Sequence, residues 1–129
     1  MIFVIIWLTQ EFLDMKDKLE AIFAMQKELA SMMKQDRYPS DSEGRVSALC
    51  TAIIHEAVEL QRTTNWKWWK TPVKFDEKEA KEELIDIWHF VIQASLELNL
   101  TPDDILNEYK RKNQINRERQ LNGIGRAHV

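Results

Sequence analysis

The chain has 129 residues, a formal net charge of −3 and an isoelectric point near 5.6, which predicts one domain (residues 1–129) and argues against a general nucleic-acid-binding protein. The single cysteine, Cys50, excludes an internal disulfide framework and favours a cytoplasmic location. Three glycines and three prolines are too few for a typical β-sandwich or β-barrel.

Residues 1–8 form an apolar run that we expect to belong to a packing or oligomer surface, with an exposed end as the alternative. The run is too short to cross a bilayer, which takes about twenty residues. It also lacks the basic lead and the small-residue cleavage site of a secretory signal. We therefore predict no membrane partner.

Helical periodicity then predicts four helices. The first covers residues 9–35 and repeats apolar residues at spacings of three and four. Turn-forming residues 38–42 separate it from the second helix, residues 44–63. Residues 65–72 lack periodicity and predict an ordered loop. The third helix begins near Asp76, where Asp76 and Glu79 have the spacing of a capping box, and it extends to about residue 98. Its predicted apolar stripe consists of Ala80, Leu84, Ile87, Val91, Ala94 and Leu98.

The fourth helix begins at Thr101 and Pro102, a cap residue followed by proline in the first turn, and it extends to about residue 120. Gly123 and Gly125 end it. Since no run alternates with period two, the predicted fold is all-α, a bundle of four to five helices. Helices this short leave apolar surface to cover, which predicts a homodimer or homotetramer.

Two acidic pairs lie inside these otherwise apolar helices: Glu56 with Glu59, and Glu83 with Asp86. A spacing of three places both members of a pair on one helix face. Two packed helices would therefore aim four carboxylates at one place, which is costly unless cations join them. Carboxylate oxygens favour Mg²⁺, for which Mn²⁺ can substitute. The alternative is ordinary acids at the edge of the core, paired with lysine or arginine.

Other metals fit the sequence less well. A di-iron carboxylate bundle needs a Glu-x-x-His motif on each of two helices, and only Asp86-x-x-His89 comes close. Zinc lacks a ligand set, because the chain has one cysteine and three scattered histidines. We expect the remaining acids to lie on solvated helix faces: Glu77, Glu79, Glu82, Glu97 and Glu108.

A row of polar and basic side chains lies on one face of the fourth helix: Tyr109, Lys112, Asn116 and Arg119. A phenol, an amide and two cations in one row predict a surface that binds a polyphosphate. The alternatives are a solvated helix end with favourable cations and a nucleic-acid contact. Arg111 and Arg117 point elsewhere and are expected to be solvated.

These motifs resemble the all-α nucleoside triphosphate pyrophosphatases, the superfamily of dimeric dUTPases and MazG-type enzymes. The four acids follow the pattern of the whole superfamily, and three segments are similar to the dimeric dUTPase branch: W-K-W-W-K at 66–70, D-x-x-H-F at 86–90 and K-x-x-x-N-x-x-R-Q at 112–120. Met25-Gln26 resembles that branch's M-Q, whose glutamine contacts uracil. The resemblance covers about residues 22–123.

The resemblance implies a Mg²⁺-dependent pyrophosphohydrolase that converts dUTP to dUMP and pyrophosphate. It implies that Glu56, Glu59, Glu83 and Asp86 bind Mg²⁺ and that Glu56 or Glu59 is catalytic, with Glu56 as general base on a metal-bound water. The implied contacts to base and sugar are Gln26, Trp68, His89 and Phe90. The implied phosphate contacts are Tyr109, Lys112 and Arg119, with Asn116 reaching base or phosphate.

The chain departs from that branch after the R-Q dipeptide, because residues 121–129 lack the tyrosine of a segment that helps to close the site. It also lacks the insertions of longer members. A MazG-like enzyme with another base preference, such as dCTP, is therefore one alternative. A non-catalytic all-α module for nucleotide binding or oligomerisation is another.

Overall fold

The computed structural model describes residues 17–33 and 36–123, and this part of the chain contains four α-helices and no strand. They are α2 (Lys18–Met32), α3 (Ser42–Arg62), α4 (Glu77–Glu97) and α5 (Pro102–Leu121). The all-α prediction is therefore confirmed. The apolar run at residues 1–8, the predicted helix start at residues 9–16 and Gly125 lie outside the described residues.

Each described helix begins at a short polar side chain that accepts a hydrogen bond from the first turn. Asp17, Asp41 and Asp76 cap α2, α3 and α4 in this way. At α5 the Thr101 hydroxyl and the Asp104 carboxylate form a reciprocal capping box. The helix starts predicted near residues 76 and 101 are confirmed, and α3 begins at Ser42 because Asp41 supplies its cap.

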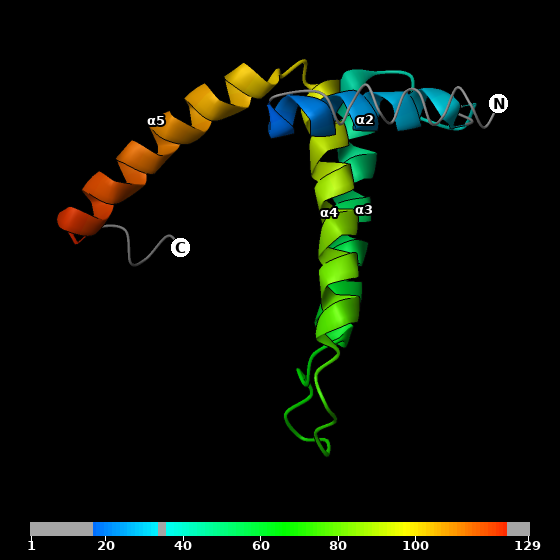
Figure 1. Cartoon of the computed structure of the whole chain (residues 1–129), viewed down its shortest axis with the longest axis vertical. Helices are drawn as coiled ribbons and strands as arrows, with labels where there is room; N and C mark the ends of the chain where they lie inside the picture. Colours follow the sequence, from blue (N-terminus) through cyan, green and yellow to red (C-terminus); the bar gives the residue numbers. More distant parts are fainter. Residues whose placement is uncertain (1–16, 34–35, 124–129) are drawn as a thin grey trace. The chain divides into compact units, whose positions relative to one another are not determined.

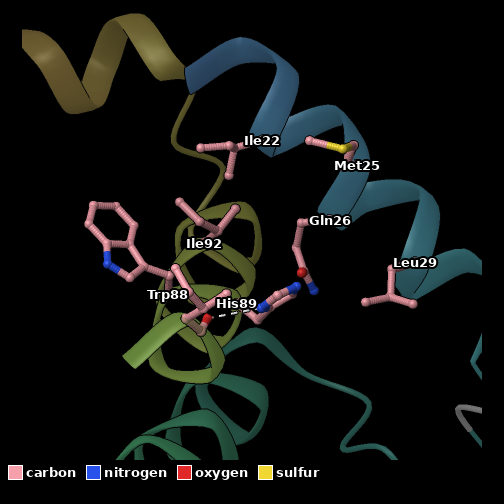
Figure 2. A pocket seen from close by; sticks show the side chains of 8 residues that line it. Ile22, Met25, Gln26, Leu29, Trp88, His89 and Ile92 are labelled. Carbon is pink, nitrogen blue, oxygen red and sulfur yellow. Dashed lines mark hydrogen bonds between the residues drawn. The ribbon is translucent and has the colours of Figure 1, made fainter. Parts of the chain in front are cut away.

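The helices α3 and α4 lie side by side as an antiparallel hairpin, and α2 packs against α4 (Figure 1). Ile22 of α2 lies over Ile92 of α4, and Met25 and Trp88 line the same hollow (Figure 2). The chain divides into two compact units, residues 1–99 and 100–129, and α5 belongs to the second unit.

The buried core of the described residues is small: Ala21, Phe23, Leu49, Ala80 and Ile92. Large apolar side chains of the same helices stay exposed: Ile22, Met25, Leu29, Ile54, Val58, Leu84, Ile85, Trp88 and Val91. This exposed apolar surface is much larger than the scattered single apolar residues of a typical monomer surface, which is typical of a surface that packs against further apolar atoms. Among the helices described, none is long and apolar enough to cross a membrane.

The loop between α3 and α4 is ordered by one amide side chain. Asn65 donates from Nδ2 to the Val73 carbonyl at 2.8 Å and accepts from the Val73 N–H at 2.9 Å, which closes the loop across eight residues. Inside it, Trp66 and Trp68 both pack edge to face against Trp69, with ring centroids 5.9 and 5.7 Å away. The predicted ordered loop is therefore confirmed.

Candidate active site

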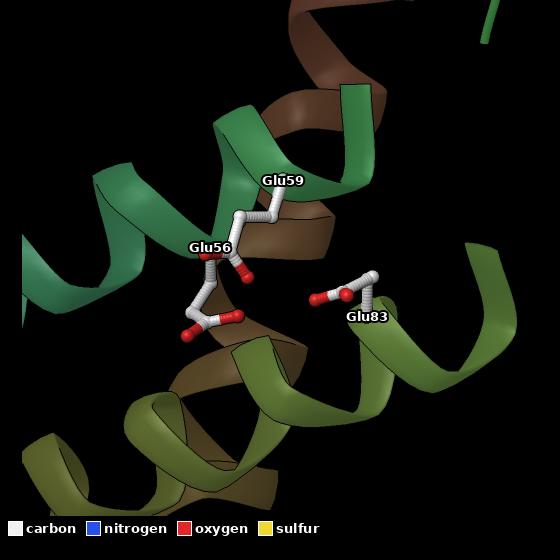
Figure 3. A group of neighbouring side chains, drawn as sticks. All are labelled: Glu56, Glu59 and Glu83. Carbon is white, nitrogen blue, oxygen red and sulfur yellow. The ribbon is translucent and has the colours of Figure 1, made fainter. Parts of the chain in front are cut away.

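Carboxylates from both helices of the hairpin converge where α3 and α4 face each other. Glu56 and Glu59 of α3 point toward Glu83 of α4 (Figure 3), and each contributes one oxygen to a group whose members lie within 4.8 Å of one another. Glu56 Oε2 and Glu83 Oε2 are buried without a hydrogen-bond partner among the described residues. Keeping unpaired anionic oxygens this close together is costly unless cations join them.

The negative charges of this group act on one another. Partial burial raises the pKa of Glu56, and the charges of Glu59 and Asp86 raise it further. Partial burial likewise raises the pKa of Glu83, together with the charges of Glu59, Asp86 and Glu56. Asp86 is exposed and lies beside the three-oxygen group, close enough for its charge to raise the pKa of both Glu56 and Glu83. The structure therefore brings the two predicted acidic pairs together.

The donor set fits a hard divalent cation. Arg45–Glu97, Lys81–Glu77 and Arg111–Glu108 are the ion pairs of the described residues, so none of the four acids is paired with lysine or arginine as the alternative interpretation requires. Carboxylate oxygens without nitrogen or sulfur ligands are typical of Mg²⁺ and Mn²⁺ sites. The buried, unpartnered oxygens of Glu56 and Glu83 are the observation that such a cation would satisfy.

A cavity of about 670 Å³ adjoins the carboxylates. Its wall includes Glu56, Asp86 and Phe90 from the hairpin and Gln26 from α2. A second hollow of about 450 Å³, mostly apolar, shares Gln26 and His89 with the first (Figure 2). Cavities of this size are suited to a nucleotide-sized ligand. The predicted base contacts Gln26, His89 and Phe90 therefore lie on the wall of a cavity that also reaches the acidic group.

His89 has a fixed ring orientation. Its Nδ1 lies 2.9 Å from the Ile85 carbonyl oxygen, and because a carbonyl oxygen only accepts, Nδ1 carries the proton. In the neutral ring Nε2 is then an acceptor. Trp68, the fourth predicted base contact, lies on the α3–α4 loop, is 86% exposed and lines neither cavity.

The predicted phosphate contacts lie on α5, in the second unit. Tyr109, Lys112, Asn116 and Arg119 are all exposed there. Arg111 instead pairs with Glu108, at 2.9 and 3.1 Å. That pair lowers the pKa of Glu108 and raises the pKa of Arg111. Among the described residues Lys112 and Arg119 make no ion pair, so both cations are available to a ligand.

A polar network beside the cavity was not predicted. Glu97, expected on a solvated face, has a side chain only 13% exposed, so that prediction was wrong. Its carboxylate accepts from Gln93 Nε2 at 3.0 Å and from the Tyr38 hydroxyl at 3.2 Å. Arg45 pairs with its other oxygen at 3.4 Å. Glu97 is largely shielded from solvent because the linker before α3 and the start of α3 pack over the end of α4.

The sequence did contain one signal for this network. Glu83, Asp86, Phe90, Gln93 and Glu97 follow one another at spacings of three and four. They therefore share one face of α4, which runs from the acidic group along the cavity. Gln93 and Glu97 lie beside the predicted apolar stripe and not within it. Glu77 and Glu108 are exposed as predicted and make exposed ion pairs.

Comparison with known proteins identifies the family to which this chain belongs. Residues 18–102 match a family model described as dUTPase, the family of all-α dimeric dUTPases. The chain belongs to the all-α dimeric dUTPase family. This confirms the resemblance to the all-α nucleoside triphosphate pyrophosphatases. The matched range contains α2, α3 and α4 of this dUTPase-family protein, and with them the acidic group and the cavity.

The chain is also similar to a relative whose name specifies a nucleotide other than dUTP. The dCTP pyrophosphatase of Enterobacteria phage T4 is 30% identical over 119 residues, which cover 83% of this chain and 67% of the relative. No solved structure matches the chain. The family model and the phage T4 relative both indicate a nucleotide pyrophosphatase, and they differ in the base that their names specify.

Proposed function

We propose that the protein is a Mg²⁺-dependent pyrophosphohydrolase that converts dUTP to dUMP and pyrophosphate. The observation that carries the proposal is the convergence of Glu56, Glu59 and Glu83, with buried unpartnered oxygens, beside a cavity of nucleotide size. Membership of the dUTPase family supports the reaction class. The position of Gln26 on the cavity wall supports recognition of a pyrimidine edge.

The residues divide the reaction between them. Glu56, Glu59, Glu83 and Asp86 would hold Mg²⁺, which when bound neutralises phosphate charge and acidifies water. Glu56 is the proposed general base, because it belongs to the acidic group and also lines the cavity that would hold the substrate. A water oxygen bonds to phosphorus, its proton goes to Glu56, and the bond to the departing pyrophosphate breaks.

Substrate binding is assigned to two sets of residues. Gln26 and His89 offer hydrogen-bonding groups to the base edge, and Phe90 offers an apolar wall to base or sugar. Trp68 stays a proposed base contact from the α3–α4 loop. On α5 we propose that Tyr109, Lys112 and Arg119 bind phosphate, with Asn116 reaching phosphate or base, because cations and a hydroxyl stabilise phosphate oxygens.

A nucleotide panel tests the proposal. The protein is incubated with Mg²⁺ and each of dUTP, dCTP, dTTP, dATP and dGTP, and pyrophosphate release is measured. We expect release from dUTP at least about tenfold faster than from dCTP, as for a site that reads a base edge. Mn²⁺ should restore activity after chelation. Folded protein that releases pyrophosphate from none of the five would refute the enzyme assignment.

A second candidate is hydrolysis of dCTP. It is favoured by the phage T4 relative, whose name specifies dCTP. The same panel separates the two candidates, because faster release from dCTP than from dUTP would keep the pyrophosphohydrolase and reject the uracil preference.

We also propose that the protein is a homodimer. The exposed apolar side chains of α2, α3 and α4 support this, since a second copy would remove them from water. Sedimentation equilibrium should give about twice the chain mass of 15.3 kDa. A mass of one chain at micromolar concentration would contradict the proposal, and four copies would show that the apolar surface supports a larger assembly.

A further inference from the structure

Three side chains connect the wall of the cavity to the end of α4. Gln26 on α2 donates from Nε2 to Gln93 Oε1 at 3.1 Å. Gln93 in turn donates from its own Nε2 to Glu97 Oε1 at 3.0 Å. Two amides in series therefore link a cavity-wall residue to a carboxylate. We call Gln26, Gln93 and Glu97 the amide relay.

The carboxylate end of the relay is held firmly. The Tyr38 hydroxyl donates to Glu97 Oε1 at 3.2 Å, and Arg45 Nη1 lies 3.4 Å from Oε2. Arg45 also donates from Nε to the Pro39 carbonyl at 2.7 Å, which fixes its guanidinium. Burial raises the pKa of Tyr38 and the charge of Glu97 raises it further, so the phenol keeps its proton and acts as a donor.

The chemistry of a carboxylate sets the orientation of both amides. An ionised carboxylate only accepts hydrogen bonds, so Gln93 has to turn its NH₂ group toward Glu97. The Gln93 carbonyl oxygen then faces Gln26, which has to turn its own NH₂ group toward Gln93. Gln26 Oε1 is left over, buried and without a hydrogen-bond partner in the described part of the chain. Figure 2 shows this amide at the cavity, directed toward His89.

We propose that Glu97, acting through Gln93, is a positioning residue that determines whether the site selects uracil or cytosine. The relay holds the Gln26 amide in one of its two orientations, and the free Oε1 then demands a donor from the base. This inference rests on the proposed function, in which a pyrimidine nucleotide occupies the cavity.

Uracil and cytosine differ in hydrogen-bonding groups that such an amide can distinguish. Uracil carries an N–H at N3 beside a carbonyl oxygen, whereas cytosine carries an unprotonated N3 beside an amino group. For a base in one position, a side-chain amide pairs with both groups of uracil in one orientation and with both groups of cytosine in the other. An amide held in one orientation therefore leaves the wrong base with unpaired polar groups.

The test removes the constraint without removing Gln26. In Glu97→Gln the new carboxamide can donate or accept, so Gln93 and Gln26 can both turn over. We measure kcat/KM for dUTP and dCTP on the same preparation, because their ratio is independent of the folded fraction. The wild-type ratio should differ from one by at least about tenfold and should move toward one by about tenfold in the variant.

A double variant and a second single variant sharpen the test. In Glu97→Gln with Gln93→Glu the acceptor-only group sits next to Gln26, which again has to donate, so the wild-type ratio should return. Gln93→Met interrupts the relay and leaves the Glu97 contacts to Arg45 and Tyr38 in place; it should relax the ratio as Glu97→Gln does. Glu77→Gln is the matched control, because it removes the charge of an exposed α4 acid, and its ratio should stay at the wild-type value.

Binding of dUMP and dCMP, followed by calorimetry, separates this inference from the proposed function. An unchanged base ratio in active Glu97→Gln and Gln93→Met would overturn the inference, as would a wild type that binds both mononucleotides equally or binds neither. A protein that hydrolyses no nucleotide but distinguishes dUMP from dCMP, and loses that distinction in the variants, would support the relay while refuting the enzyme.

Discussion

Glu83→Gln should lower kcat for pyrophosphate release by about a thousandfold, since loss of one proposed metal ligand would remove several kcal/mol of charge stabilisation. In the same variant the metal-free protein should be at least as stable as the wild type. One carboxylate oxygen of Glu83 lies within 4.8 Å of one carboxylate oxygen each of Glu56 and Glu59. No lysine or arginine of the described residues forms an ion pair with these three carboxylates. A neutral amide relieves that repulsion and can donate to Glu59.

Thermal unfolding with and without Mg²⁺ is the measurement that accompanies the kinetics. The wild type should gain melting temperature on addition of Mg²⁺, because a ligand of the folded state stabilises it, and Glu83→Gln should gain little. Glu82→Gln is the matched control, one position away and exposed. A Glu83→Gln variant that is active, or one that Mg²⁺ stabilises as strongly as the wild type, would show that these acids do not form the metal site.

Lys112→Ala should lower kcat/KM for dUTP by about ten- to a hundredfold, because a hydrogen bond to a charged group contributes about 1.5–3 kcal/mol. The effect should fall mainly on KM if the lysine binds the phosphates equally in ground state and transition state. The helix itself should be unaffected, since Lys112 is exposed and alanine is the best helix former.

Arg117→Ala is the control for the α5 row. It removes the same charge from the same helix but lies off the face of Tyr109, Lys112, Asn116 and Arg119. Its kcat/KM should stay within about twofold of the wild type, as for a surface charge without a specific contact. Equal losses in both variants would indicate a general electrostatic effect rather than a phosphate-binding row, and no loss in Lys112→Ala would remove that residue from the substrate site.

Local signals in the sequence predicted the helices well because those signals act within one turn. Asp76 and Thr101 cap helices whichever way the helices later pack, so their positions were readable from a few neighbouring residues. The acidic pairs were also readable, since a spacing of three places two side chains on one face in any helix. What the sequence could not show was how far α3 and α4 are offset from each other.

The apolar stripe predicted on α4 illustrates the limit of periodicity. Leu84 and Val91 belong to that stripe and are 44% and 41% exposed, whereas Ile92, outside it, is 4% exposed. Periodicity identifies apolar positions but does not say which of them a neighbour in the same chain covers. Here α2 covers Ile92 and leaves much of the stripe open.

By itself the sequence determined an all-α chain, the starts of α4 and α5, and four acids paired at helical spacing. Only the tertiary structure decided that Glu97 is partly buried, and that Gln26, Gln93 and Glu97 form a relay. The physical reason is distance along the chain. The contacts Gln26–Gln93, Tyr38–Glu97 and Arg45–Glu97 join residues 67, 59 and 52 positions apart. Such contacts depend on how whole helices pack, and no local pattern encodes that packing.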